Sequence, residues 1–257
     1  MVIAVTNQKG GVGKTTTTLN LGVYLAQHKK KVLLIDLDPQ SNLTSGLGLK
    51  HAEREEGKKT VYEVLLGQAS ITETFLATDI PELFLVPSDL SLAGVEIELV
   101  NQISRELKLK SAVAGVKDQY DFVLIDCPPS LGLLTINALA ASDHIFIPVQ
   151  CEYYALEGIG QLMETIKLIK VGINPELIVS GIILTMFDTR TRLSTSVVDE
   201  VKKYFPKETF DTIIPRNVKL SEAPSHGMSI STYDPNSSGA KAYNMLAQEV
   251  IQRYASK

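Results

Sequence analysis

The stretch that decides the fold is Val2-Ile3-Ala4-Val5-Thr6-Asn7-Gln8-Lys9-Gly10-Gly11-Val12-Gly13-Lys14-Thr15, which three further threonines follow. Its β-branched beginning predicts a buried strand. The glycines after it let backbone N–H groups converge, because no Cβ blocks an approaching anion. Apolar residues at helical spacing then predict a helix that begins near Lys14, and its positive N-terminal end also favours phosphate. The stretch therefore predicts a strand, a phosphate-binding loop and a helix.

Two side chains at the end of this loop suit a nucleotide bound with a metal ion. Lys14 can reach the β- and γ-phosphates, and the Thr15 hydroxyl can ligate Mg²⁺. The common phosphate-loop pattern has glycine where this chain has Gln8, and an additional lysine, Lys9, follows it. The alternative is a glycine-rich turn with a chance Lys-Thr pair, which the flanking strand and helix disfavour. The residues expected to bind the nucleotide are Lys9, Gly10, Gly11, Val12, Gly13, Lys14, Thr15 and Thr16.

The composition is that of a globular protein. The chain has 257 residues, of which 44% are hydrophobic and 21% charged. Its net charge of −4 argues against a generally basic nucleic-acid-binding surface but allows a local basic patch. No apolar run has the length of a membrane span, and a strand from residue 2 leaves no room for a signal peptide. We expect one cytoplasmic domain, residues 1–257.

Two further buried-strand patterns end in aspartate. Residues 32–35 and 122–125 are continuous apolar runs, typical of parallel strands covered on both faces. Asp36 and Asp38 follow the first run and Asp126 follows the second, at the sheet edge where open α/β folds bind ligands. Asp126 suits a carboxylate that holds Mg²⁺ directly or through water, and Asp36 is expected near the same ion. The alternative is that these aspartates only form turns.

Strand and helix patterns alternate along the rest of the chain. The further expected strands cover residues 83–87, 144–149, 177–186 and 210–214. The further expected helices cover residues 61–66, 71–77, 90–106 (with a break near Asn101), 131–141, 156–169 and 239–254, and one more ends at Tyr204. This order predicts an α/β fold: a single-domain P-loop NTPase with a doubly wound, mostly parallel sheet of about seven strands, flanked by helices.

As an ordered set, these motifs resemble the ParA/MinD ATPases with a deviant Walker A motif, and among them the short ParA proteins often called Soj. The matching blocks are residues 9–16, 36–40, 126–130, 148–158 and 215–225. The resemblance implies ATP and Mg²⁺ as ligands and an ATP-dependent homodimer. It implies that Lys9 reaches the partner's nucleotide, and that Asp38 orients or activates the attacking water. Asp38, Lys14 and Lys9 would thus carry catalysis, while loop 127–130 senses the γ-phosphate.

The resemblance also implies a base site and partners. A backbone turn at Pro215, with the Asn217 amide, offers donors and acceptors for an adenine edge, and similar residues contact the base in ParA-like structures. A dimer would present basic residues to non-specific double-stranded DNA, and a ParB/Spo0J-like protein would stimulate hydrolysis and release the DNA. That cycle would segregate a chromosome or plasmid on the nucleoid. Our DNA-binding candidates, each of which could instead be a plain solvated cation, are Arg190, Arg192, Arg216, Lys219 and Lys241.

Three other classes share parts of the pattern. A MinD-like membrane-cycling ATPase needs a C-terminal amphipathic helix with a basic face, but residues 248–257 carry only two cations and one acid. A nitrogenase-like iron protein has glycine after its ligand cysteines, whereas Pro128 follows Cys127 and Glu152 follows Cys151. The third class is a metabolic ligase of the same superfamily, but this sequence carries no catalytic signature of such a ligase. We expect no membrane partner.

Overall fold

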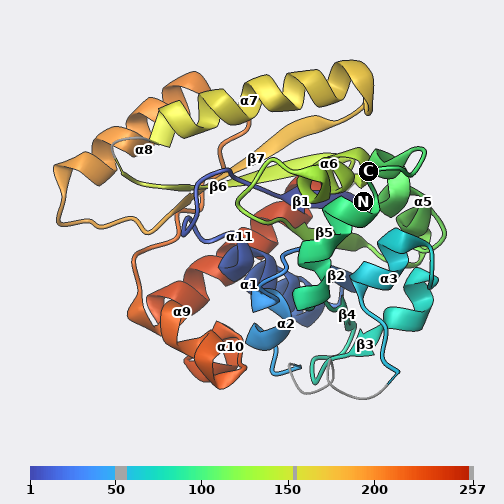
Figure 1. Ribbon diagram of the computed structural model, residues 1–257. Coiled ribbons are helices and arrows are strands. Elements are labelled where there is room, and N and C mark those ends of the chain that lie inside the picture. Colours follow the sequence, from blue (N-terminus) through green and yellow to red (C-terminus); the bar gives the residue numbers. More distant parts are fainter. Residues whose placement is uncertain (50–56, 153–154, 255–257) are drawn as a thin grey trace.

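A seven-stranded sheet forms the centre of the chain in the computed structural model, which describes residues 1–49, 57–152 and 155–254 (Figure 1). The strand order is β3-β4-β2-β5-β1-β6-β7, and all pairs are parallel except β3 with β4. The strands are β1 Val2–Val5, β2 Val32–Asp36, β3 Leu76–Ala77, β4 Leu83–Val86, β5 Phe122–Asp126, β6 His144–Gln150 and β7 Ile178–Thr185. The predicted α/β fold class is confirmed.

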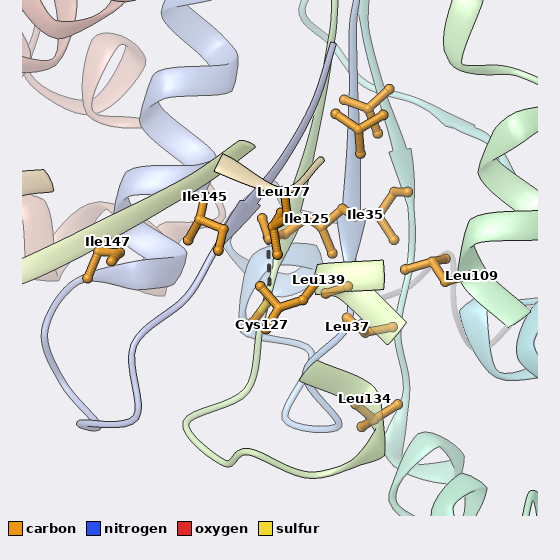
Figure 2. Packing of buried hydrophobic residues seen from close by; sticks show 14 of the residues in the cluster. Ile35, Leu37, Leu109, Ile125, Cys127, Leu134, Leu139, Ile145, Ile147 and Leu177 are labelled. Carbon is orange, nitrogen blue, oxygen red and sulfur yellow. Dashed lines mark hydrogen bonds between the residues drawn. The ribbon is translucent and has the colours of Figure 1, made fainter. Parts of the chain in front are cut away.

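Helices cover both faces of this sheet (Figure 1). Along β2, Val32 and Leu34 pack on one face while Leu33 and Ile35 pack on the other, because successive strand side chains point in opposite directions. Figure 2 shows part of the second cluster, in which Ile35 lies near side chains from neighbouring strands and helices. The α-helices are α1 Lys14–Gln27, α2 Asn42–Gly46, α3 Val61–Leu66, α4 Val95–Glu98, α5 Lys108–Ala114, α6 Leu133–Ala141, α7 Ala155–Gly172, α8 Arg192–Tyr204, α9 Val218–Glu222, α10 Ile230–Tyr233 and α11 Ser238–Tyr254.

Different helices cover the two faces of the sheet. Helices α1, α2, α9, α10 and α11 contribute buried residues to the cluster that contains Val32 and Leu34. Helices α3, α5, α6, α7 and α8 contribute to the cluster that contains Leu33 and Ile35. Both faces of the parallel strands are therefore buried, which explains why their sequences are continuous apolar runs and do not alternate.

The strand expected at residues 210–214 is wrong. Phe210 and Ile214 donate backbone hydrogen bonds to Ile182 and Leu184 of β7, but only isolated bridges form. The intervening N–H groups of Asp211 and Thr212 instead donate to the Glu249 carboxylate of α11, at 2.8 and 3.0 Å. A side chain from a distant helix thus replaces part of the strand ladder. The seventh strand is β3, within the segment expected to be helical.

Two expected helices are also corrected. Residues 71–77 form a short 3₁₀ turn over Ile71–Thr74 and then enter β3. The helix expected over residues 90–106 is interrupted at the expected break near Asn101, but it is also shorter on both sides. It consists of the 3₁₀ turn Leu90–Gly94, the single turn of α4, and a further 3₁₀ turn from Arg105. Ser104 has a φ of 56°, a left-handed conformation that a continuous helix cannot contain. The periodic apolar residues of this segment still reach the core, since Leu92, Val95 and Leu99 are fully buried.

Candidate nucleotide-binding site

The loop between β1 and α1 lies at the carboxyl edge of the sheet, between β5 and β6. The Asn7 side chain fixes its start: its amide nitrogen donates to the Pro148 carbonyl at 2.8 Å, and its oxygen accepts from the Lys9 N–H at 3.0 Å. Gly11 and Gly13 have φ angles of 73° and 91°, a left-handed region that favours glycine. The predicted strand, loop and helix are confirmed, and α1 begins at Lys14.

Lys14 is turned into this loop. Only 7% of its surface is exposed, and its ammonium donates to the Lys9 carbonyl oxygen at 3.2 Å. Burial lowers the pKa of Lys14, whereas the nearby Asp126, Cys127 and Asp38 side chains oppose that shift. The ammonium thus lies in the concave side of the loop, where the phosphates of a nucleotide would supply the negative charge that stabilises it.

Asp126 provides an unpaired buried oxygen beside the loop. Its Oδ1 accepts from the Thr18 hydroxyl at 3.2 Å, while its Oδ2 has no hydrogen-bond partner in the part of the chain that the structure describes. Burial raises the pKa of Asp126 well above its usual value, the neighbouring Asp36 adds to this, and the Thr15 hydroxyl and Lys14 oppose it. A buried carboxylate oxygen of this kind, near a threonine hydroxyl, is a donor set suited to Mg²⁺.

Asp36 lies beside Asp126 at the end of the neighbouring strand. It is fully buried; Oδ1 accepts from the Asp38 N–H at 3.2 Å, and Oδ2 accepts from the N–H and hydroxyl of Thr44, at 2.9 and 2.7 Å. Burial raises the pKa of Asp36 to about 6. Because both oxygens already accept hydrogen bonds, this side chain connects the end of β2 to α2, and the geometry favours Asp126 as the metal-binding carboxylate.

Asp38 faces the cavity that the loop encloses. Its Oδ1 accepts from the Gln40 N–H at 2.9 Å, and its backbone carbonyl accepts from the Ser88 hydroxyl at 2.8 Å. These bonds hold its carboxylate at the cavity wall with 8% of the residue exposed. The cavity has a volume of about 600 Å³ and is lined by Gly10, Gly11, Gly13, Lys14, Thr15, Thr16, Leu19, Asp38, Gln40, Asn42, Ser45, Gly46, Pro129, Met186, Leu220, Ser221, Pro224 and Ser225.

A second cavity of about 220 Å³ adjoins the first and contains the predicted base-contacting residues. Pro215 and Asn217 line it, and Gly13, Thr16 and Met186 line both cavities. The Asn217 amide caps α9: its oxygen accepts from the Lys219 N–H and its nitrogen donates to Ser238, both at 2.8 Å. The structure therefore brings Pro215 and Asn217 to the phosphate loop, although the Asn217 amide already has partners.

The predicted DNA-binding cations differ in whether they form ion pairs with acidic side chains. Arg190 donates twice to Asp188, Lys219 pairs with Glu222 at 2.9 Å, and Arg216 lies 3.6 Å from Glu152. The same Glu152 lies 3.4 Å from Lys9. Arg192 and Lys241 are exposed and have no ion pair within the described residues. Tyr153 and Tyr154, expected on the dimer face, fall outside the described part of the chain.

Several residues of the site were not predicted from the sequence. Thr18 and Thr44 bind the two buried aspartates, and Glu152 pairs with two cations. The run of threonines after Lys14 gave a signal for Thr18, since helical spacing places residues 14 and 18 on one face. Nothing local in the sequence indicated Thr44 or Glu152, because their partners are eight or more residues away.

The two cysteines are free and belong to the hydrophobic core. Both are buried, and burial raises the pKa of Cys127 strongly and that of Cys151 to about 12. Within residues 1–49, 57–152 and 155–254, no group of three or more His, Cys, Asp or Glu side chains is arranged to hold a metal ion. The described part of the chain thus gives no support to the iron–sulfur alternative.

Comparison with known proteins decides the family. A family model described as "AAA domain" matches residues 1–179. The chain is 56% identical to the sporulation initiation inhibitor protein Soj of Bacillus subtilis over 97% of both chains. It is 50% identical to the chromosome partitioning protein ParA of Myxococcus xanthus, over 98% of this chain and 88% of that protein. The chain belongs to the ParA/Soj family of chromosome-partitioning ATPases. The predicted family is confirmed.

Solved structures of ParA/Soj-like folds agree with this architecture. A Mycobacterium smegmatis protein described as cobyrinic acid a,c-diamide synthase, with bound ATP analogue and magnesium, is 37% identical and has a TM-score of 0.85, over 99% of this chain and 96% of that one. The cell division ATPase MinD of Pyrococcus furiosus is 26% identical with a TM-score of 0.81, over 98% of both chains. The sequence identity of this chain to the two partitioning proteins is higher than its identity to either of these two solved structures, which supports the ParA/Soj assignment.

Proposed function

We propose that this ParA/Soj-family chain is an ATP-dependent dimerising switch that binds DNA non-specifically and moves a chromosome or plasmid. One observation carries the proposal: the phosphate loop and Asp38 line a cavity of about 600 Å³, and the unpaired Asp126 oxygen is buried beside Lys14 and Thr15 of that loop. An adjoining cavity at Pro215 and Asn217 has space for part of a base. This arrangement suits a nucleoside triphosphate with a divalent cation.

Thr15 and Asp126 would hold Mg²⁺, which neutralises charge on the β- and γ-phosphates when it is bound. The Lys14 ammonium would exchange the Lys9 carbonyl for phosphate oxygens, which are stronger acceptors because they are charged. Asp38 would orient the attacking water from the cavity wall. Among the described residues, no arginine lines the larger cavity, so none of them is placed there to act as an arginine finger in cis, and we expect slow hydrolysis.

Lys9 would carry the dependence on dimerisation. It lies at the exposed start of the loop, with 44% of its side chain accessible, and the only partner of its ammonium among the described residues is Glu152. An exposed ammonium paired with one carboxylate can transfer to a partner subunit's phosphates at small cost. Two subunits would then close face to face, doubling the basic surface formed by Arg190, Arg192, Arg216, Lys219 and Lys241. A ParB-type partner would stimulate hydrolysis and release the DNA.

Binding to arbitrary duplex DNA tests this function. The protein is titrated onto a duplex with ATP and with ADP over a salt series, and anionic liposomes form a parallel arm. We expect DNA binding only with ATP, with affinity falling steeply as salt rises, because phosphate contacts release counterions. DNA binding in neither state would refute the proposal. ATP-dependent liposome binding without DNA binding would favour the MinD-like alternative. Among the described residues, no helix has the length and apolar character of a membrane span.

A further inference from the structure

One stretch of the chain has an unusual charge composition. From Thr60 to Ser104 there are seven Asp or Glu residues and no Lys, Arg or His. The other 212 residues hold 22 acidic and 25 basic residues, for a net charge of +3, although the whole chain has −4. The net negative charge of the chain therefore comes from this segment, although Lys59 just before it pairs with Glu73 and the Arg105 side chain just after it donates to the Val100 carbonyl. The segment still favours a cationic partner over DNA.

The end of this segment also exposes large apolar side chains. The exposed fractions are 74% for Leu90, 79% for Ile97, 54% for Val100 and 90% for Ile103. They are not a failed core, because Leu92, Val95 and Leu99 of the same stretch are fully buried and anchor it. Exposed apolar side chains grouped in one stretch of a chain commonly mark a site of protein interaction. We define the acidic apolar surface as Leu90, Glu96, Ile97, Glu98, Val100 and Ile103.

A hydrogen bond links this surface to the nucleotide cavity. Glu96 Oε1 accepts from the backbone N–H of Leu133, the first residue of α6, at 2.8 Å. A Cβ at the preceding Gly132 would overlap Glu96 Oε1, so the contact is close. The loop between Asp126 and α6 contains Pro129, which lines the cavity. Glu96 is therefore bonded to the start of the helix that directly follows the loop beside the phosphates.

A second contact holds the same region to α6. The Asn137 side chain of α6 donates to the Arg105 carbonyl at 2.9 Å and accepts from the Leu109 N–H at 3.1 Å. Asn137 is fully buried, so these bonds are shielded from water. The acidic apolar surface is thus attached to α6 at its N-terminal end through Glu96 and one turn later through Asn137.

We propose that the acidic apolar surface is the docking site of a basic, apolar-containing segment of a partner protein, and that Glu96 transmits docking to the loop at Pro129. The inference rests on the proposed function, since it assigns a site to the stimulating partner. Charge selects the occupant: a cationic segment is attracted by Glu96 and Glu98 while its apolar side chains cover Ile97 and Ile103. A second copy of this chain placed symmetrically on this surface would oppose acid with acid.

Paired serine substitutions test the docking site. Ile97→Ser with Ile103→Ser removes the apolar contact, and Leu168→Ser with Val171→Ser on α7 is the matched control, because those side chains are 73% and 82% exposed. The probe is the purified ParB-type protein encoded in the same genome, added to the full chain with ATP and DNA. We expect the Ile97/Ile103 variant to need at least about tenfold more of this protein for half-maximal stimulation of ATP hydrolysis, equivalent to about 1.4 kcal/mol. The control and the unstimulated rate stay at the wild-type level.

Two substitutions of Glu96 test transmission. Glu96→Ala removes the acceptor for the Leu133 N–H, whereas Glu96→Gln keeps an acceptor oxygen and loses the charge. We expect Glu96→Ala to lower the maximal stimulated rate at saturating partner and Glu96→Gln to restore it. A lost charge alone would change the half-saturating concentration of the partner and leave the maximum. Equal maxima in both variants and the wild type would refute the role of Glu96.

The possible negative results can be distinguished from one another. If the wild-type chain is not stimulated by the ParB-type protein, the partner step of the proposed function is wrong and this docking site falls with it. If the wild type is stimulated and the Ile97/Ile103 variant responds identically, the partner docks elsewhere and only this inference is wrong. If that variant loses ATP-dependent dimerisation before any partner is added, the surface contacts a second copy of the chain, which also refutes the inference.

Discussion

The Glu152 carboxylate lies 3.4 Å from the Lys9 ammonium and 3.6 Å from the Arg216 guanidinium, so one acid holds a phosphate-loop lysine and a DNA-binding candidate together. All three side chains are about half exposed, so each pair contributes little to stability. We expect Glu152→Gln to free Lys9 for a partner subunit and strengthen the ATP-bound dimer by less than about fivefold. Sedimentation with ATP measures this; Glu222→Gln, which frees Lys219 instead, is the control, and a weaker Glu152→Gln dimer would contradict the prediction.

The second prediction concerns Lys14, whose ammonium is buried inside the loop. Lys14→Ala removes the charged donor to the phosphates, and we expect nucleotide affinity to fall by about a hundredfold or more, because hydrogen bonds between charged groups are the strong ones. Calorimetric titration with ATP and with ADP measures the loss. Lys110→Ala on α5, an exposed lysine outside the cavity, should bind normally. Wild-type affinity in Lys14→Ala would mean that the backbone alone holds the phosphates.

The parts of the fold that could be predicted depend on local patterns. The phosphate loop and the strands before Asp36 and Asp126 are each encoded by contiguous residues, and the structure has each of them at the predicted position. The strand expected at 210–214 was wrong because Glu249, more than thirty residues away, takes the N–H groups of Asp211 and Thr212. Glu152 had no signal for the same reason: its partners Lys9 and Arg216 are brought to it only by the sheet order. A contact between two side chains that are far apart in the sequence produces no periodic pattern in the sequence.

A third prediction separates the two candidate roles of Arg216, which is exposed and also lines the smaller cavity. If its guanidinium contacts DNA phosphate in both subunits of a dimer, Arg216→Ala should flatten the slope of log affinity against log salt by about two. Nucleotide affinity, measured by calorimetry on the same variant, should stay unchanged. An unchanged salt slope with weaker ATP binding would assign Arg216 to the nucleotide and remove it from the DNA surface. Lys202→Ala, at the far end of α8, is the control.

A fourth prediction concerns the sheet itself. A Cβ on Gly181 of β7 would lie 2.5 Å from ring atoms of both Phe146 and Phe210, which pack edge to face at 5.2 Å. Gly181→Ala forces these buried rings apart, and we expect a loss of about 1–3 kcal/mol in the free energy of unfolding. Gly160→Ala on α7 is the matched control: no atom lies within 4 Å of its Cβ, so it should be neutral or slightly stabilising. Urea unfolding of both variants measures the difference, and equal midpoints would contradict the prediction.

The last prediction tests the assignment of Asp38 to water activation. Its backbone is fixed by Ser88 and its carboxylate lies at the cavity wall, so Asp38→Ala should remove the group that orients water and leave the loop around Lys14 intact. On the proposed assignment, hydrolysis needs that carboxylate, whereas nucleotide binding and dimerisation do not. We therefore expect Asp38→Ala to bind ATP, dimerise and remain on DNA, because the step that releases it no longer occurs. Gel filtration with ATP and a DNA-retention time course measure both properties. An Asp38→Ala chain that stays monomeric with ATP would show that this carboxylate acts in dimer assembly, before any water is activated.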